Sequence, residues 1–507
     1  MKKKTFLKNA AILTATAIIL RTVGIFFRIY ISNAIGAEGM GLHQLILSIY
    51  MFASAVASSG INVAVTRLVS EKIGTGGLCT VKKILFHSLA ASIILGLAAF
   101  AIMFFGADFI SEKWLHDTRA SLSMKVISFG LPFMAVSSCL KGYFTARRKA
   151  STPSNSQLFE QLIRILTVVM LLRFINTKNL TLACAAVVMG NTLSEIGACA
   201  YIYIGYRRDK RTIREGGTMH GGIVRSLCAI FIPVALSSYL NTLLHTIENV
   251  MVPDALTRYT VSRELSLSQF GMLKGMALPM LFFPSSFLGA VSTLLIPEVS
   301  QYGAEGKNAS IKSTINYTLL VTIITSLPVS AIFCVYAYEI GELVYKSSEV
   351  GMYILALAPV LPFMYIESMI AGILNALNRQ SAMLRFNIYN SALRIALILT
   401  LVPVFGIYAF LAIMIVSNLF TSCLNLHLLL KTADLHFEFT KLVVKPFFAA
   451  GTALVCTLAL KQPIDALCGC RFVCVMSGTL VLCLIYTFLI LISKCVTAEE
   501  LRPLRRR

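Results

Sequence analysis

The chain has 507 residues, of which 57% are hydrophobic and only 13% are charged. Soluble domains carry about 25% charged residues, so the composition excludes an ordinary soluble protein and predicts an integral membrane protein. The formal net charge of +22 is of a size that nucleic-acid-binding proteins also reach. Here, however, the basic residues are spread between apolar segments, so we expect contacts with lipid headgroups and no nucleic-acid partner.

Apolar runs of about 20 residues recur along the whole chain, each long enough to cross a ~30 Å hydrocarbon core. In lipid, every backbone amide must bond within its own segment, so these runs are predicted to be helices. The N-terminal run resembles a signal peptide, but it continues past Arg21 and is expected to be retained as the first span. The sequence therefore predicts an all-α membrane protein with about fourteen spans, at residues 9–32, 43–66, 84–106, 121–144, 155–175, 181–205, 226–252, 272–297, 314–336, 352–374, 386–403, 406–428, 442–460 and 472–493.

The basic residues alternate between the two sides that this list of spans defines. An even number of spans places both termini on one side, and that side carries roughly 30 Lys and Arg residues against roughly 9 on the other. Loops rich in Lys and Arg stay in the cytoplasm. We therefore expect a multi-pass protein of the cytoplasmic membrane with both termini inside.

The loops between these spans are all too short to form a soluble domain, and the phosphate-binding pattern GxxxxGK[ST] is absent. The sequence thus predicts neither an enzyme nor a nucleotide-driven pump. An ion gradient, the membrane potential or the substrate gradient itself is left as the energy source. The thirteen cysteines mostly lie singly in apolar runs, and the one close pair, Cys468 and Cys470, has no second pair or histidine at zinc-site spacing. We expect no metal and no cofactor.

An internal repeat relates residues 142–165 to residues 372–395. When the two segments are aligned without gaps, Gly142, Ala146, Ser151 and the Arg164-Ile165 pair find identical residues in the second copy. The two copies are six spans apart, so they share an orientation in the membrane. The repeat predicts two parallel six-helix lobes, residues 1–215 and 216–432, around a central cavity, followed by two further helices and a basic cytoplasmic tail in residues 433–507.

Ionisable side chains within the predicted spans cost at least ~2.5–3.5 kcal/mol each and therefore usually face a cavity or a partner. Nine of them are candidates for function. Several of these side chains could instead have a purely structural role. Long side chains can reach the membrane interface, and residues four apart can pair along one helix. A cluster of arginines suits an anionic, phosphate-bearing ligand. The candidates for substrate binding are Arg21, Arg28, Arg164, Arg394 and Lys274, and the candidates for counter-charge or ion coupling are Glu160, Glu195, Glu248 and Glu367.

Several short segments resemble the stage V sporulation protein B group of the multidrug/oligosaccharidyl-lipid/polysaccharide flippase superfamily. The likeness extends over most of the chain and is strongest in residues 1–170 and 365–430. The segments that carry it are RTVGIFFR at 21–28, IGAEGMGL at 35–42, KGYF at 141–144, SQLFEQLIR at 156–164, AGILNAL at 371–377 and VFGIY at 404–408.

The resemblance implies a bacterial transporter that moves an undecaprenyl-pyrophosphate-linked saccharide to the outer leaflet by alternating access, for peptidoglycan or polysaccharide synthesis in sporulation or in the cell envelope generally. It implies a cavity-facing role for Arg21 and a groove for the lipid tail in residues 442–493. Cell-wall synthesis proteins are candidate partners. Two alternatives stay open at this point, a cation-coupled multidrug exporter of the same superfamily and an integral-membrane polyprenyl-phosphate glycosyltransferase.

Overall fold

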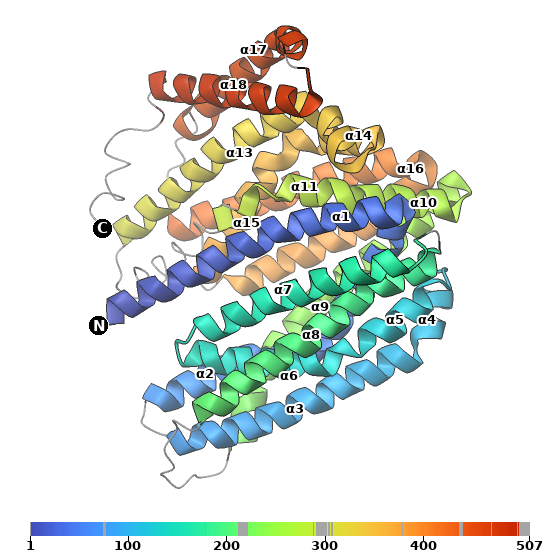
Figure 1. Cartoon of the computed structure of the whole chain (residues 1–507). Coiled ribbons are helices and arrows are strands. Elements are labelled where there is room, and N and C mark those ends of the chain that lie inside the picture. The colour runs from blue at the N-terminus through green and yellow to red at the C-terminus, as the bar shows by residue number, and fades with distance from the viewer. Residues whose placement is uncertain are drawn as a thin grey trace. The chain divides into compact units, whose positions relative to one another are not determined.

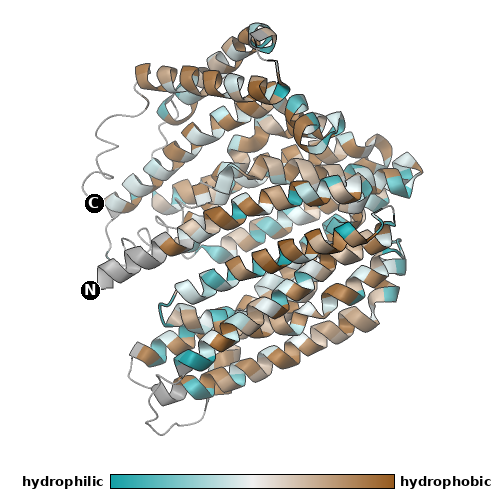
Figure 2. Ribbon diagram, in the orientation of Figure 1, coloured by the Kyte–Doolittle hydropathy of each residue, from teal (hydrophilic) through white to brown (hydrophobic). Residues whose placement is uncertain are grey.

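The computed structural model describes residues 2–74, 78–177, 179–210, 222–286, 288–289, 302, 305, 308–377, 379–434, 440–467, 469–493 and 495. Within these ranges every regular element is a helix (Figure 1). Apolar residues predominate along the helices (Figure 2), as expected for segments whose outer surface faces lipid. The predicted all-α membrane class is confirmed.

The chain forms two compact units, residues 1–271 and 272–507. The first unit, here called the N-unit, extends beyond the predicted lobe boundary at residue 215 because the next long helix packs against the N-terminal helices. The N-unit contains α1 (Lys2–Ser58), α2 (Ile61–Gly74), α3 (Leu78–Phe105), α4 (Ala107–Lys113), α5 (Ala120–Ser128), α6 (Gly130–Ala146), α7 (Ser151–Phe174), α8 (Leu180–Lys210), α9 (Ile223–Thr260) and α10 (Arg263–Phe270).

The second unit, here called the C-unit, begins within a π-helical segment. Its described elements are η1 (Gly271–Ala277), α11 (Leu278–Phe282), α13 (Asn308–Tyr345), α14 (Ser348–Leu357), η2 (Ala358–Val360), α15 (Leu361–Ala376), α16 (Gln380–Ala433), η3 (Thr440–Val444), α17 (Lys445–Leu467) and α18 (Arg471–Ile492). The short 3-10 turn η2 contains Pro359 and is followed by Pro362. Proline removes a helical hydrogen bond, so the chain changes helix type there.

Ten helical segments of the described chain are long and apolar enough to cross a membrane. Two of them, residues 14–73 and 380–433, are 60 and 54 residues long, and a span needs about 20. Each contains a kink at a glycine with positive φ, Gly36 or Gly406, so each has the length of two crossings. Helix α7 has 24 residues but is less apolar because it carries three charged side chains. The number fourteen itself stays a prediction, since the predicted span 272–297 lies partly outside the described residues.

The internal repeat corresponds to the same local structure in both copies. In the first copy α6 ends at Ala146 and α7 begins at Ser151, and in the second α15 ends at Ala376 and α16 begins at Gln380. The equivalence continues beyond the aligned segments, because the break after α7 at Ile175 and Asn176 falls where the same alignment places the kink at Gly406. The pair α7–α8 of the N-unit therefore corresponds to the two halves of α16 in the C-unit.

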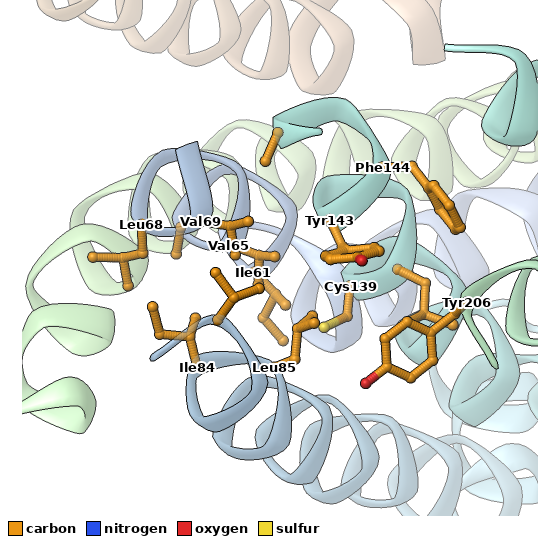
Figure 3. Close-up of a cluster of buried hydrophobic side chains, with 14 of the residues drawn as sticks. Ile61, Val65, Leu68, Val69, Ile84, Leu85, Cys139, Tyr143, Phe144 and Tyr206 are labelled. Atoms are coloured by element: carbon orange, nitrogen blue, oxygen red, sulfur yellow. The ribbon is translucent and has the colours of Figure 1, made fainter. Parts of the chain in front are cut away.

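A cluster of buried apolar side chains holds α2, α3, α6 and α8 together at one end of the N-unit (Figure 3). Ile61, Leu85 and Tyr143 are at most 1% exposed, and burying a large apolar side chain contributes about 1.5–3 kcal/mol. The Tyr143 hydroxyl donates to Asp209 at 2.7 Å, and Arg147 pairs with the same carboxylate at 2.6 Å. This packing fixes α6 against α8, and the two helices supply side chains to the cavity described next.

Candidate functional site

A polar cavity of about 460 Å³ lies within the N-unit. Helix α7 contributes four of its lining residues, at positions one helical turn or less apart, so one face of α7 forms a wall. Helices α1, α6 and α8 form the other walls. The lining residues are Leu20, Ser58, Met134, Ser138, Lys141, Gln157, Glu160, Gln161, Arg164 and Glu195.

The best-defined interaction in the cavity is the pair formed by Glu160 and Arg164 on α7. An Nη atom of Arg164 donates to a Glu160 carboxylate oxygen at 2.7 Å, and the side chains of Arg164 and Glu160 are only 25% and 17% exposed. The pair follows from the sequence, because residues four apart lie on one face of a helix. Lys141 of α6 approaches the other Glu160 oxygen at 3.8 Å, so one carboxylate lies between two cations.

Glu195 of α8 is the second acid in the cavity. Its Oε2 atom is buried and makes no hydrogen bond to any residue that the structure describes. A buried carboxylate oxygen without a donor is costly and calls for a water, an ion or a ligand. The charges of Glu160, Lys141 and Arg164 all act on Glu195, so these four side chains form one electrostatic group, here called the α7 cluster.

Two further α1 residues border the α7 cluster. His43 is only 6% exposed, and its ring lies in the electrostatic field of both Arg28 and Arg164. Tyr50 lies in the field of Glu195, Arg164 and Glu160. Its hydroxyl donates weakly to the sulfur of the cavity residue Met134 at 3.7 Å. Arg28 therefore acts electrostatically on a residue that borders the cavity, although Arg28 does not line the cavity itself.

The structure distributes the nine predicted residues unevenly. Glu160, Arg164 and Glu195 line the cavity, and Arg28 lies near it. Arg21 has an exposed side chain, although its neighbour Leu20 lines the cavity. Glu248 is 2% exposed in α9 and is not among the lining residues.

The three remaining predicted residues belong to the C-unit. The charge of Arg394 on α16 acts on Glu367 of α15, so these two groups form a pair of neighbours. Lys274 lies in the π-helical η1, with its ammonium 5.8 Å from the centre of the Phe410 ring. Such a cation–π contact holds an ammonium group in apolar surroundings.

Sequence reasoning missed Lys141, Gln157 and Gln161 as cavity residues, and His43 and Tyr50 beside them. Lys141 falls at a predicted helix end, where a lysine is expected to reach the headgroups, and only the fold shows that it points at Glu160. The glutamines carry no charge, so a search for ionisable side chains within the spans does not single them out. His43 directly follows the glycine-rich segment 35–42, which was the available clue.

Among the residues that the structure describes, no three His, Cys, Asp or Glu side chains come together as a metal site. What the cavity offers instead is a dense set of hydrogen-bonding groups. Arginine and lysine donate, carboxylates accept, and amides and hydroxyls do both. Such a set can hold a ligand rich in hydroxyl and phosphate oxygens.

Comparison with known proteins places the chain in a family. A model of the family described as polysaccharide biosynthesis protein matches residues 6–302. The chain belongs to this family. It is 26% identical to stage V sporulation protein B of Bacillus subtilis (strain 168) over 407 residues, covering 79% of this chain and 78% of that protein.

A further relative and two solved structures are also similar to the chain. The lipid II flippase MurJ of Bacillus subtilis (strain 168) is 20% identical over 348 residues, 64% of this chain and 62% of that protein. The solved structure of lipid II flippase MurJ in an inward closed conformation superposes with a TM-score of 0.71 at 16% identity, covering 95% of this chain and 99% of that one. An inward-facing multidrug resistance MATE family transporter of the MOP superfamily gives 0.65 at 13% identity, covering 84% and 98%. The resemblance read from the short segments is confirmed.

Proposed function

We propose that the protein is a flippase that moves an undecaprenyl-pyrophosphate-linked saccharide across the bacterial cytoplasmic membrane. The observation that carries the proposal is the α7 cluster, a set of mutually interacting charges within predicted spans of a chain that belongs to a polysaccharide biosynthesis family. Charged groups at membrane depth are costly and are kept where a pathway needs them. The named relatives include a lipid II flippase and a sporulation protein, so a peptidoglycan precursor is the first substrate to test.

The chemistry of the cavity suits a saccharide headgroup better than a purely anionic or cationic ligand. Two acids share the space with two cations, and Gln157, Gln161 and Ser138 add neutral donors and acceptors. Sugar hydroxyls can donate to the acids and accept from the cations and amides. Arg164 and Lys141 can in addition neutralise phosphate charge. The cavity is of mixed charge, since Glu160 and Glu195 balance the two cations.

The proposal includes an orientation and a transport cycle. Both termini lie in the cytoplasm, where the basic loops are retained. The headgroup enters from the cytoplasmic side while the prenyl tail stays in lipid, and a conformational change then exposes the headgroup outside. The substrate can drive that change only by binding the two conformations differently. Glu195 is the candidate for coupling to an ion, since one of its buried oxygens has no donor among the described residues.

The test is translocation of fluorescent short-chain lipid II in proteoliposomes, read from the fraction that dithionite quenches in the outer leaflet. We compare the wild type with Arg164→Gln and, as the matched control, Arg173→Gln. Arg173 is the same residue type on the same helix α7, but it is exposed at the C-terminal end and outside the cavity. We expect Arg164→Gln to slow translocation about tenfold or more, since one lost charged contact is worth about 1.5–3 kcal/mol, and Arg173→Gln to leave it unchanged.

Two outcomes would count against the proposal in different ways. Equal translocation by both variants would keep the flippase function and remove the α7 cluster as its site. Wild-type vesicles that flip lipid II no faster than protein-free vesicles, but accumulate organic cations in response to an ion gradient, would favour a multidrug exporter. The MATE-like fold and the two cavity acids make that exporter the second candidate.

A further inference from the structure

A second cavity of the N-unit, separate from the α7 cluster, is almost entirely apolar. It has a volume of about 470 Å³ and lies among α1, α3, α4 and α9. Ala53 of α1, Met103 of α3 and Met251 of α9 line it, and Ile110 and Trp114 of the α4 region close one end. None of its lining residues carries a charge. A cavity of this kind cannot bind the polar headgroup proposed above.

The position of the cavity identifies the class of its occupant. The three long helices that form it are long and apolar enough to cross a membrane. The loop that follows α3 belongs to the face that the basic-residue asymmetry assigns to the outside. An apolar space at this depth is surrounded by lipid hydrocarbon. Its volume suits one hydrocarbon chain and is too small for an undecaprenyl chain, which is several times longer than an ordinary acyl chain.

Two cations lie at the outer end of this cavity. Lys113 directly precedes Trp114 and follows the lining residue Ile110 by three positions, so it shares the face of α4 that borders the cavity. Arg258 follows Met251 by two helical turns, further along the same face of α9. Both side chains are exposed, and no ion pair of either is recorded in the described part of the chain.

The neighbouring acids do not cancel these two charges. Asp254, between Met251 and Arg258, already pairs with Arg263 at 2.6 Å and with His116 at 3.1 Å. Asp108 pairs with Lys125 at 2.7 Å. Glu112 lies two positions from both Ile110 and Trp114, on the opposite face of α4. The rim of the cavity therefore keeps an excess of positive charge.

We propose that this cavity binds one acyl chain of an anionic phospholipid from the outer leaflet, with the lipid phosphate held between Lys113 and Arg258. A basic residue at a membrane surface attracts anionic lipid with about 1 kcal/mol, and an indole ring at the interface anchors well beside a headgroup. Trp114 is 54% exposed, so it contacts both the cavity and the surrounding lipid. The site does not depend on which substrate the protein transports.

The protein carries its own reporter for this site, because Trp114 is the only tryptophan in the chain. The full-length protein is reconstituted into vesicles that contain a low fraction of brominated lipid, either phosphatidylglycerol or phosphatidylcholine with the same acyl chains. The quenching of Trp114 fluorescence is then measured. We expect brominated phosphatidylglycerol to occupy the site at least about threefold more strongly than brominated phosphatidylcholine. Unlabelled phosphatidylglycerol should reverse the quenching, a measurement that needs no variant.

Three variants locate the effect. Lys113→Gln with Arg258→Gln should abolish the preference for the anionic lipid, and the control Arg173→Gln, another exposed arginine on the same side of the membrane, should keep it. Ala53→Phe fills the cavity and should reduce quenching by both lipids, provided that size-exclusion chromatography shows a folded protein. Equal quenching by the two lipids in the wild type would overturn the headgroup site. Quenching unchanged in a folded Ala53→Phe variant would overturn the acyl-chain site.

Discussion

The α7 cluster of the N-unit and its repeat counterpart in the C-unit use the same helical scaffold for different electrostatics. When the alignment of the two copies is extended without gaps, Arg164 corresponds to Arg394, but Glu160 corresponds to Asn390 and Glu195 to Asn425. The acids of the first copy are thus neutral amides in the second. The acid near Arg394 is Glu367, which comes from the preceding helix α15.

The repeat therefore preserves a backbone and one cation, while the counter-charge changes position. In the N-unit an arginine pairs within its own helix at 2.7 Å. In the C-unit the amide oxygen of Asn390 accepts instead from the Ser417 hydroxyl at 2.8 Å, and this contact joins the two halves of α16. We therefore expect the N-unit to carry the more sensitive site, and four predictions test this.

The largest effect is expected from breaking the α7 pair. Arg164→Ala leaves the mostly buried Glu160 without its main partner, and removal of one member of a buried pair costs about 3–5 kcal/mol. The melting temperature in detergent should fall clearly. The double variant Glu160→Gln/Arg164→Gln removes both charges and should recover most of the stability, but not translocation. Recovery of both would show that the pair is structural only.

The second effect concerns how closely the helices pack in the N-unit. A methyl group on Gly41 of α1 would overlap the backbone oxygen of Leu267 on α10, so two backbones would have to separate. We expect Gly41→Ala to cost about 1–3 kcal/mol, as overpacking does. Gly24→Ala on the same helix meets nothing within 4 Å and serves as the control. A melting temperature unchanged by Gly41→Ala would refute this contact.

The third effect tests the C-unit counterpart directly. Arg394→Gln should slow lipid II translocation by no more than about threefold, which is less than the tenfold change that ~1.4 kcal/mol represents. The reason is that the positions equivalent to Glu160 and Glu195 are the neutral Asn390 and Asn425. The comparison uses the same proteoliposomes as Arg164→Gln, at matched protein content. An equal or larger loss with Arg394→Gln would mean that both units hold the headgroup.

The smallest effect is expected from Tyr336→Phe, which is compared with a substitution of Glu195. Like Glu195 Oε2, the Tyr336 hydroxyl of the C-unit has no hydrogen-bond partner among the described residues. It faces Gly478 of α18, in a packed region and not in a polar cavity. Tyr336→Phe removes an unsatisfied group, so stability should stay within about 0.5 kcal/mol or rise slightly, and translocation should not change. Glu195→Gln, measured alongside, should lower translocation and leave stability similar.

Part of this site could be predicted from the sequence, since the pair Glu160–Arg164 depends only on helical periodicity. Spacing of four residues fixes one helix face wherever the helix packs. The position of Lys141 could not be predicted, because it depends on how α6 lies against α7. The different roles of Glu195 and Glu248 could not be predicted either. Both are acids in apolar helices, but only Glu195 lines the polar cavity.

The class of the protein and its approximate spans follow from the sequence alone, because hydropathy is a local property. The repeat and the resemblance to a family are also visible in the sequence, because they rest on short segments that can be compared directly. Other features became visible only in the folded chain: which charged side chains share a cavity, that α9 packs with the N-unit, and that an apolar space lies beside Trp114. These depend on contacts between residues far apart in the chain. The lipid environment leaves such contacts without a sequence signal, since helices that are apolar on every side do not reveal which side packs on protein.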